Sequence, residues 1–184
     1  MPRYVALLRG VNVGGVRVAM SDLRAAVEGL GYTDVATYVQ SGNVTFTADG
    51  RPEDLAGIIR TAIAASTSID PLVIVLTAQE WHEVVASNPY PEETEPTRLH
   101  AVIAARDFTD EHRKAALQVR DAVREAGSDD DLTVVGRVVY LHLPGGMGRS
   151  KLAEKLGRSK AAGHLEATAR NWRTVLALAE RLGG

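Results

Sequence analysis

The order of short apolar stretches between residues 4 and 77 restricts the fold more than any other feature of the sequence. Apolar or alternating runs predict strands at residues 4–8, 35–39, 44–47 and 72–76. Between them, apolar side chains at helical spacing predict two helices, one capped by Ser21 and one that begins at Pro52. The resulting strand-helix-strand-strand-helix-strand order is typical of the ferredoxin-like split βαβ arrangement, in which two helices cover one face of a four-stranded antiparallel sheet.

The second half of the sequence repeats part of this pattern. Predicted strands lie at residues 99–104, 132–135 and 138–143, and predicted helices at 109–126 and 150–156. Thr109 is placed to cap the longer helix, and Gly136 with Arg137 has the composition of a tight hairpin turn. The second half therefore resembles the first as far as its third strand and second helix.

The end of the sequence predicts a helix from about residue 169 to residue 182, and no fourth strand is indicated before it. The apolar stripe of this helix leaves Leu178 outside and consists of Trp172, Val175, Leu176, Ala179 and Leu182. Because an apolar stripe normally faces the core, we expect Trp172 to be buried rather than to act as a stacking platform.

Two prolines mark a boundary between the halves. A predicted helix at residues 79–86 leads into Pro89 and Pro91, and proline ends a helix. We therefore expect two subdomains, residues 1–90 and residues 91–184. The predicted fold class is α+β: two ferredoxin-like (split βαβ, α/β plait) subdomains with antiparallel sheets, plus a C-terminal helix.

Composition narrows the environment and the chemistry. The sequence contains no cysteine, which excludes disulfides, thiolate catalysis and cysteine metal sites and suits a reducing cytoplasm. The first apolar stretch is too short for a signal peptide or a membrane span, so we expect a cytoplasmic protein without a membrane partner. A net charge of -2 gives no overall attraction to nucleic acid, which would need a local basic patch.

Polar residues of the first half are expected to converge at one rim of its sheet. In the split βαβ arrangement the end of the first strand lies beside the start of the third. The topology therefore brings together five polar residues from the two connections: Arg9, Asn12, Gln40, Ser41 and Asn43. A guanidinium, several amides and a hydroxyl suit an anionic ligand, although the two asparagines could equally satisfy only the backbone of their turns.

Four cations of the second half are further candidates. Arg149 and Lys151 follow a glycine-rich segment that opens a helix, a place where backbone N–H groups can bind phosphate, although the order differs from that of nucleotide-binding loops. Arg170 and Arg173 lie at the start of the last predicted helix. Paired guanidiniums recognise phosphate or carboxylate, and they could equally form salt bridges within the protein.

Four short segments that contain the candidate residues together resemble a bacterial family known only as domain of unknown function 1697. The segments are residues 7–15 (LLRGVNVGG), 38–44 (YVQSGNV), 148–152 (GRSKL) and 170–174 (RNWRT). The likeness extends from about residue 4 to residue 182. It implies two α/β plait subdomains, and it implies no reaction.

These observations lead to three hypotheses of function. The first is a binding protein for an anionic ligand that bears phosphate or carboxylate, such as a nucleotide. RNA is a weaker candidate ligand, because the net charge is negative and the sequence lacks the aromatic signature of base-stacking sheets. The second is a small transferase or hydrolase that uses the same rim, for which no general base is evident. The third is a structural or interaction protein. The five histidines lack metal-ligand spacing, so we predict neither a metal site nor a cofactor, and the sequence does not indicate an oligomeric state.

Overall fold

The computed structural model describes residues 1–12, 17–158 and 166–183, which form two compact units. The first unit contains Met1–Glu83 and Ala177–Gly184, and the second contains Val84–Leu176. Both boundaries fall inside helices, namely α3 (Ala78–Ala86) and α7 (Trp172–Leu182). The last residues of the chain therefore belong to the first unit. The sequence-based limit at residue 90 stays a prediction.

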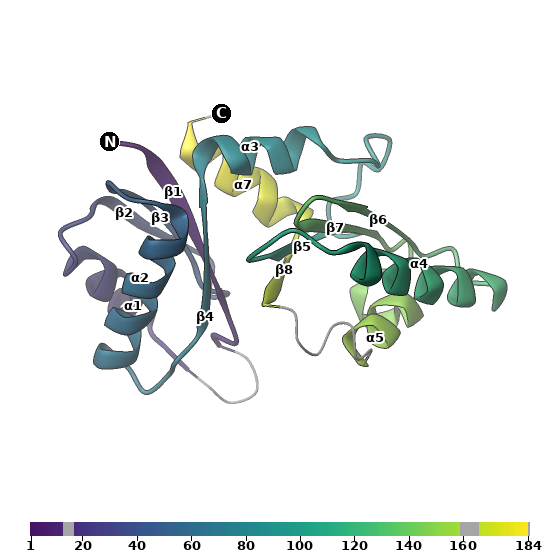
Figure 1. The fold of residues 1–184 in the computed structure, drawn as a ribbon, viewed down its shortest axis with the longest axis horizontal. Coiled ribbons are helices and arrows are strands. Elements are labelled where there is room, and N and C mark those ends of the chain that lie inside the picture. Colours follow the sequence, from purple (N-terminus) through teal and green to yellow (C-terminus); the bar gives the residue numbers. More distant parts are fainter. Residues whose placement is uncertain (13–16, 159–165, 184) are drawn as a thin grey trace. The chain divides into compact units, whose positions relative to one another are not determined.

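The first unit is a four-stranded antiparallel sheet with two helices on one face (Figure 1). Its elements are β1 (Arg3–Arg9), α1 (Met20–Glu28), β2 (Thr33–Tyr38), β3 (Asn43–Thr47), α2 (Pro52–Ser66) and β4 (Leu72–Thr77). The strand order is β2-β3-β1-β4, which is the ferredoxin-like arrangement. This confirms the predicted fold of the first half.

Alternation along the strands explains how this sheet acquires its core. Tyr4, Ala6 and Leu8 of β1 pack with apolar residues of α1 and α2, such as Leu23 and Ile59. The intervening residues of β1 point to the opposite face, because neighbouring side chains of a strand alternate. Pro52 begins α2, as predicted. Ser21 does not cap α1, which begins at Met20 without a side-chain cap, so that prediction was wrong.

The second unit has the same architecture (Figure 1). Its elements are β5 (Leu99–Ala104), α4 (Asp110–Glu125), β6 (Asp131–Val135), β7 (Val138–His142), the 3-10 helix η1 (Met147–Arg149), α5 (Lys151–Arg158) and β8 (Ala167–Asn171). The strand order β6-β7-β5-β8 matches that of the first sheet. Thr109 caps α4 as predicted, because its side chain accepts a hydrogen bond from the backbone N–H of His112.

Strand β8 corrects the prediction that the second half lacks a fourth strand. The predicted helix from residue 169 is in fact a strand as far as Asn171, and it pairs with β5 in antiparallel register. Its two buried side chains, Thr168 and Arg170, are both polar. Because strand prediction depends on apolar alternation, a strand whose buried positions are polar does not show in the sequence.

Helix α7 therefore begins later than predicted, and its buried face includes most of the predicted stripe. Trp172 is buried, as expected, and its ring lies 6.2 Å from that of Tyr140 in an edge-on arrangement. Val175, Ala179 and Leu182 of the predicted stripe are also buried, whereas Leu176 is exposed and Leu178, outside the predicted stripe, is fully buried. Within the described residues, no helix is long and apolar enough to cross a membrane.

Candidate functional site

The structure brings the two predicted connections of the first unit together at one end of its sheet. The backbone N–H of Leu8 donates to the carbonyl of Gly42 over 2.8 Å, and Asn12 Nδ2 donates to the carbonyl of Gln40, also over 2.8 Å. We call residues 9–12 and 38–43, at this end of the sheet, the N-terminal rim. It contains all five candidates from the first half of the sequence.

Close packing at the rim requires a glycine at position 42. A Cβ atom on Gly42 would lie 2.8 Å from Leu8 Cβ and 3.3 Å from Val11 Cβ. Its backbone also has a φ of +74°, in the left-handed region that favours glycine. Contact between the end of β1 and the β2–β3 turn is thus built into the sequence at this position.

The two rim asparagines hold the backbone in place. Asn12 bonds both backbone groups of Val18, since its Oδ1 accepts from the N–H at 2.9 Å and its Nδ2 donates to the carbonyl at 3.2 Å. Asn43 is fully buried, and its Nδ2 donates to the carbonyl of Tyr38 at 3.0 Å and to Ser41 Oγ at 2.9 Å. Both amides therefore act as structural groups, as the alternative interpretation of the sequence allowed.

The rim backbone contains four residues with left-handed conformations. Gly10 and Gly42 have φ values of 80° and 74°, and Asn12 and Val39 have values of 56° and 47°. Asparagine tolerates this region, but a β-branched residue there is a clear outlier. Val39 is also 49% exposed, so burial of its side chain does not explain the conformation.

The equivalent turn of the second unit reverses the chain without such an outlier. There Gly136 has a φ of 52°, and the adjacent carbonyl of Arg137 accepts from the N–H of Ala104 over 2.9 Å. The side chain of Arg137 then donates from Nε to the carbonyl of Ala104 over 2.7 Å. A β-hairpin in this fold therefore does not need a left-handed valine, and the backbone of Val39 calls for another explanation.

The sequence segments on and beside the rim contain cations and no carboxylate. Arg9 and Arg17 are exposed on or beside the rim, and residues 1–21 and 35–48 contain no Asp or Glu. Asp70, which precedes the strand paired with β1, is engaged by two nitrogens of Arg60 at 2.6 and 2.7 Å. The nearby carboxylate is thus already compensated by another guanidinium.

The candidates Arg149 and Lys151 surround a serine with a structural role. Ser150 is buried, and its Oγ donates to Asp130 Oδ2 at 2.7 Å while accepting from the backbone N–H of Ala153 at 2.9 Å. Arg149 is exposed and donates from Nε to the carbonyl of Gly145 at 3.0 Å, and exposed Lys151 pairs with Glu154 at 3.3 Å. This segment caps α5 through Ser150 and leaves two cations on the surface.

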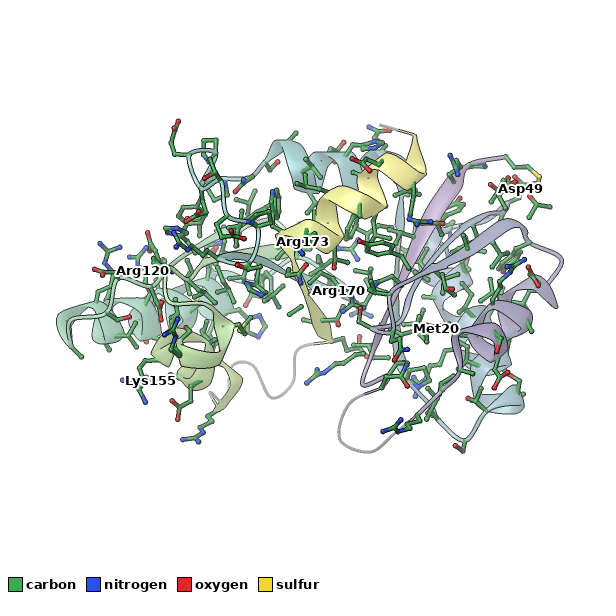
Figure 2. The ribbon with its side chains drawn as sticks, turned by 180° about the vertical axis from the view of Figure 1, so that it is seen from behind. Met20, Asp49, Arg120, Lys155, Arg170 and Arg173 are labelled. Carbon is green, nitrogen blue, oxygen red and sulfur yellow. The ribbon has the colours of Figure 1, made fainter. Side chains whose placement is uncertain are left out.

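Arg170 and Arg173 occupy different environments on β8 and α7 (Figure 2). Arg170 is buried on the sheet face opposite to α4 and α5, and it donates from Nη1 to Thr168 Oγ1 at 2.7 Å and to the carbonyl of Ala169 at 2.8 Å. Burial lowers the pKa of Arg170 to about 10. Arg173 is exposed. Since Lys151 is on α5, which covers the other face, the structure does not bring it together with Arg170.

Two cations beside the rim escaped prediction from the sequence. Arg17 precedes Val18, which Asn12 holds by two hydrogen bonds. Arg181, in the last turn of α7, lies with its Cζ atom 4.9 Å from the ring centroid of Tyr38. The absence of acidic residues over 1–21 could have indicated Arg17, whereas Arg181 is brought to Tyr38 only by the tertiary fold. Among the described residues, no group of three or more His, Asp or Glu side chains could hold a metal ion.

Comparison with known proteins identifies a family and a similar fold. No curated protein matches the chain. A solved structure described as the conserved bacterial protein SP0830 from Streptococcus pneumoniae is 22% identical, covers 98% of both chains and gives a TM-score of 0.71. At this identity the likeness shows the fold alone. The model of a family described as protein of unknown function (DUF1697) matches residues 1–140. The chain therefore belongs to the DUF1697 family.

Proposed function

We propose that the chain binds an anionic ligand, one bearing phosphate or carboxylate, at the N-terminal rim. The observation that carries this proposal is the left-handed backbone of Val39. Such a conformation costs a β-branched residue about 1–2 kcal/mol and persists only where the surroundings impose it, which happens mainly at functional sites. The simple turn of Gly136 and Arg137 in the second unit is evidence that the fold itself does not require it.

Left-handed residues are also useful for binding anions. In turns they let successive backbone N–H groups point toward one concavity, and such concavities bind phosphate and other anions. Four left-handed residues occur within the rim, on both of its connections. The bonds made by Asn12 and Asn43 hold these connections in one conformation, so a ligand would meet a preorganised backbone.

The side chains at the rim supply charge and hydrogen bonds. Arg9 and Gln40 are exposed, and a guanidinium can bind phosphate or carboxylate through two parallel hydrogen bonds. We assign direct ligand contact to Arg9, Gln40 and Ser41, and a supporting role to Asn12 and Asn43. Arg149, Lys151, Arg170 and Arg173 stay sequence-based candidates in the second unit. Among specific ligands we propose a nucleotide first, and RNA with weaker support.

A thermal-shift panel tests this function. The purified chain is heated with inorganic phosphate, nucleotides, phosphosugars, carboxylic acids and short RNAs, because a ligand that binds the folded state raises the unfolding midpoint. We expect a saturable rise with an anion that is lost in Arg9→Ala. The matched control is Arg24→Ala, which removes an exposed α1 arginine paired with Glu28 and so changes the net charge equally.

The outcomes of this panel separate the three hypotheses. An equal shift in Arg9→Ala and in the unaltered chain would show that the ligand does not bind at the rim. Turnover of a bound ligand that disappears with Arg9→Ala, in a protein that stays folded, would favour the transferase or hydrolase hypothesis. No shift with any member of the panel would overturn the binding proposal and favour the interaction hypothesis.

A further inference from the structure

Arg181, near the C-terminal end of α7, contacts Tyr38 at the end of β2, the strand that leads into the rim. Arg181 Cζ lies 4.9 Å from the centroid of the Tyr38 ring, within the range of a cation–π contact. Both residues belong to the first unit. Tyr38 is directly before Val39, and its carbonyl accepts the hydrogen bond from Asn43. A residue near the end of the chain thus contacts a turn near its beginning.

The guanidinium of Arg181 is available to a ligand. Its side chain is exposed, and among the described residues no carboxylate lies within salt-bridge distance of it. A cation–π contact uses the flat face of the guanidinium and leaves the N–H groups at its edge free to donate. An anion at the rim could therefore bind Arg181 while the stacking on Tyr38 remains.

Strand register puts Arg9 and Tyr38 on the same face of the sheet. Tyr38 pairs with Asn43, and Asn43 pairs with Leu7, so the three side chains share one face of the sheet. This is the face away from α1 and α2, and Arg9 lies on it because it follows Leu7 by two residues. With usual spacings between and along strands, the Cα atoms of Arg9 and Tyr38 are separated by about 12 Å. Arg9 and the guanidinium of Arg181 that stacks on the Tyr38 ring can therefore contact two anionic groups of one ligand.

We propose that Arg181 is a second ligand-binding cation of the rim and that the ligand carries two anionic groups. This inference rests on the proposed function. It narrows the ligand to compounds with two linked phosphates or two carboxylates, because a single anion would use only one of the two cations. It also makes the last turn of α7 part of a binding site in the first unit.

Four anions test whether the chain prefers ligands with two anionic groups. Dissociation constants are obtained from the concentration dependence of the thermal shift at constant ionic strength, for pyrophosphate against phosphate and for succinate against acetate. We expect at least one doubly anionic probe to bind about tenfold more tightly than its single-group partner, the effect of one additional charge-assisted contact. In Arg181→Ala this preference should fall to about twofold or less, whereas binding of the single anion should change little.

Three further variants make the result specific. Arg181→Lys keeps the charge and should retain part of the preference, and Arg24→Ala should leave it unchanged. Arg9→Ala should weaken both members of a pair. A cation in the last turn of a helix also stabilises the helix through the helix dipole, so Arg181→Ala can lower the stability of the free protein. The stability without ligand is therefore recorded for each variant and is not used as the readout.

The failure of this inference differs from the failure of the proposed function. If Arg181→Ala keeps the full preference while Arg9→Ala loses binding, the rim binds anions without Arg181 and the inference is wrong. If both single and double anions bind the unaltered chain equally, the claim of a doubly anionic ligand is wrong. If none of the four probes binds at all, both proposals fail.

Discussion

Val39 is the residue on which the account of the rim depends most. A valine in the left-handed region is strained, whereas asparagine adopts that region at little cost. We expect Val39→Asn to raise the unfolding free energy by about 1 kcal/mol, or the midpoint by about 3 °C. Chemical denaturation with and without a bound anion measures this gain and any accompanying loss of affinity.

The matched control for Val39 is Val135, which has a similar exposure of 40% and lacks the positive φ. Val135→Asn replaces a good strand former at the end of β6 and should lower the unfolding free energy by about 0.5–1 kcal/mol. If Val39→Asn destabilises the chain as much as Val135→Asn does, the backbone of Val39 is not strained.

Gly42 and Gly31 test the close packing of the rim. Both have positive φ values, but a Cβ on Gly31 would meet nothing within 4 Å, whereas a Cβ on Gly42 would collide with Leu8. We expect Gly31→Ala to cost about 1 kcal/mol from backbone strain and Gly42→Ala to cost about 3 kcal/mol from strain and overpacking together. Equal losses in urea denaturation would show that the β1–turn contact is looser than described.

His100 makes stability depend on pH. It is buried in the second unit, its Nδ1 has no hydrogen-bond partner among the described residues, and burial lowers its pKa below the usual value of 6.5. The unfolded chain therefore binds a proton more readily than the folded one, and stability falls as pH decreases below 6.5 toward the lowered pKa. Urea denaturation from pH 7 to pH 5 should show a smaller loss of unfolding free energy in His100→Leu. The same loss in both proteins would contradict a buried neutral histidine.

Some residues of the rim could be predicted from the sequence and others could not. Gly42 and Asn43 have the composition of a hairpin turn, so their place was predictable. Val39 was not, because valine normally favours strands and gives no signal of a positive φ. Arg181 is far from Tyr38 in the sequence, and only the folded chain brings the two together.

Among the elements, β8 shows where pattern recognition fails. In the other seven strands the face that packs against the helices is apolar, and these strands were predicted within a residue or two at each end. In β8 the buried positions hold Thr168 and Arg170, which satisfy each other through a hydrogen bond of 2.7 Å. A buried polar pair of this kind is stabilised by tertiary structure, and its sequence resembles a polar loop or the start of a helix.

The cap of α5 provides a prediction at the same scale. Ser150→Ala removes a hydrogen bond to the buried carboxylate of Asp130 as well as the cap on Ala153, so we expect a loss of about 2–3 kcal/mol. Thr109→Ala removes only an exposed cap from α4 and should cost about 1 kcal/mol. Thermal unfolding of both variants makes the comparison. A smaller loss for Ser150→Ala than for Thr109→Ala would show that Asp130 is satisfied without the serine.

In the whole molecule, the same strand order occurs twice with different turns. Both sheets have the third strand beside the first, but one unit connects its second and third strands through Gly136 and Arg137 and the other through the longer rim turn. The net charge of -2 is not evenly distributed, since residues 1–21 and 35–48 contain Arg3, Arg9 and Arg17 and no acidic residue. The first unit therefore has a sheet rim that is fixed by hydrogen bonds and contains no acidic residue.

The most direct test of anion binding at this rim is an amide NMR titration of the isotope-labelled chain with pyrophosphate and with succinate. We predict saturable shift changes for residues 9–12 and 38–43, with one dissociation constant for both segments. Changes that instead concentrate in residues 149–158, or that rise linearly without saturation across the surface, would contradict a specific anion site at the N-terminal rim.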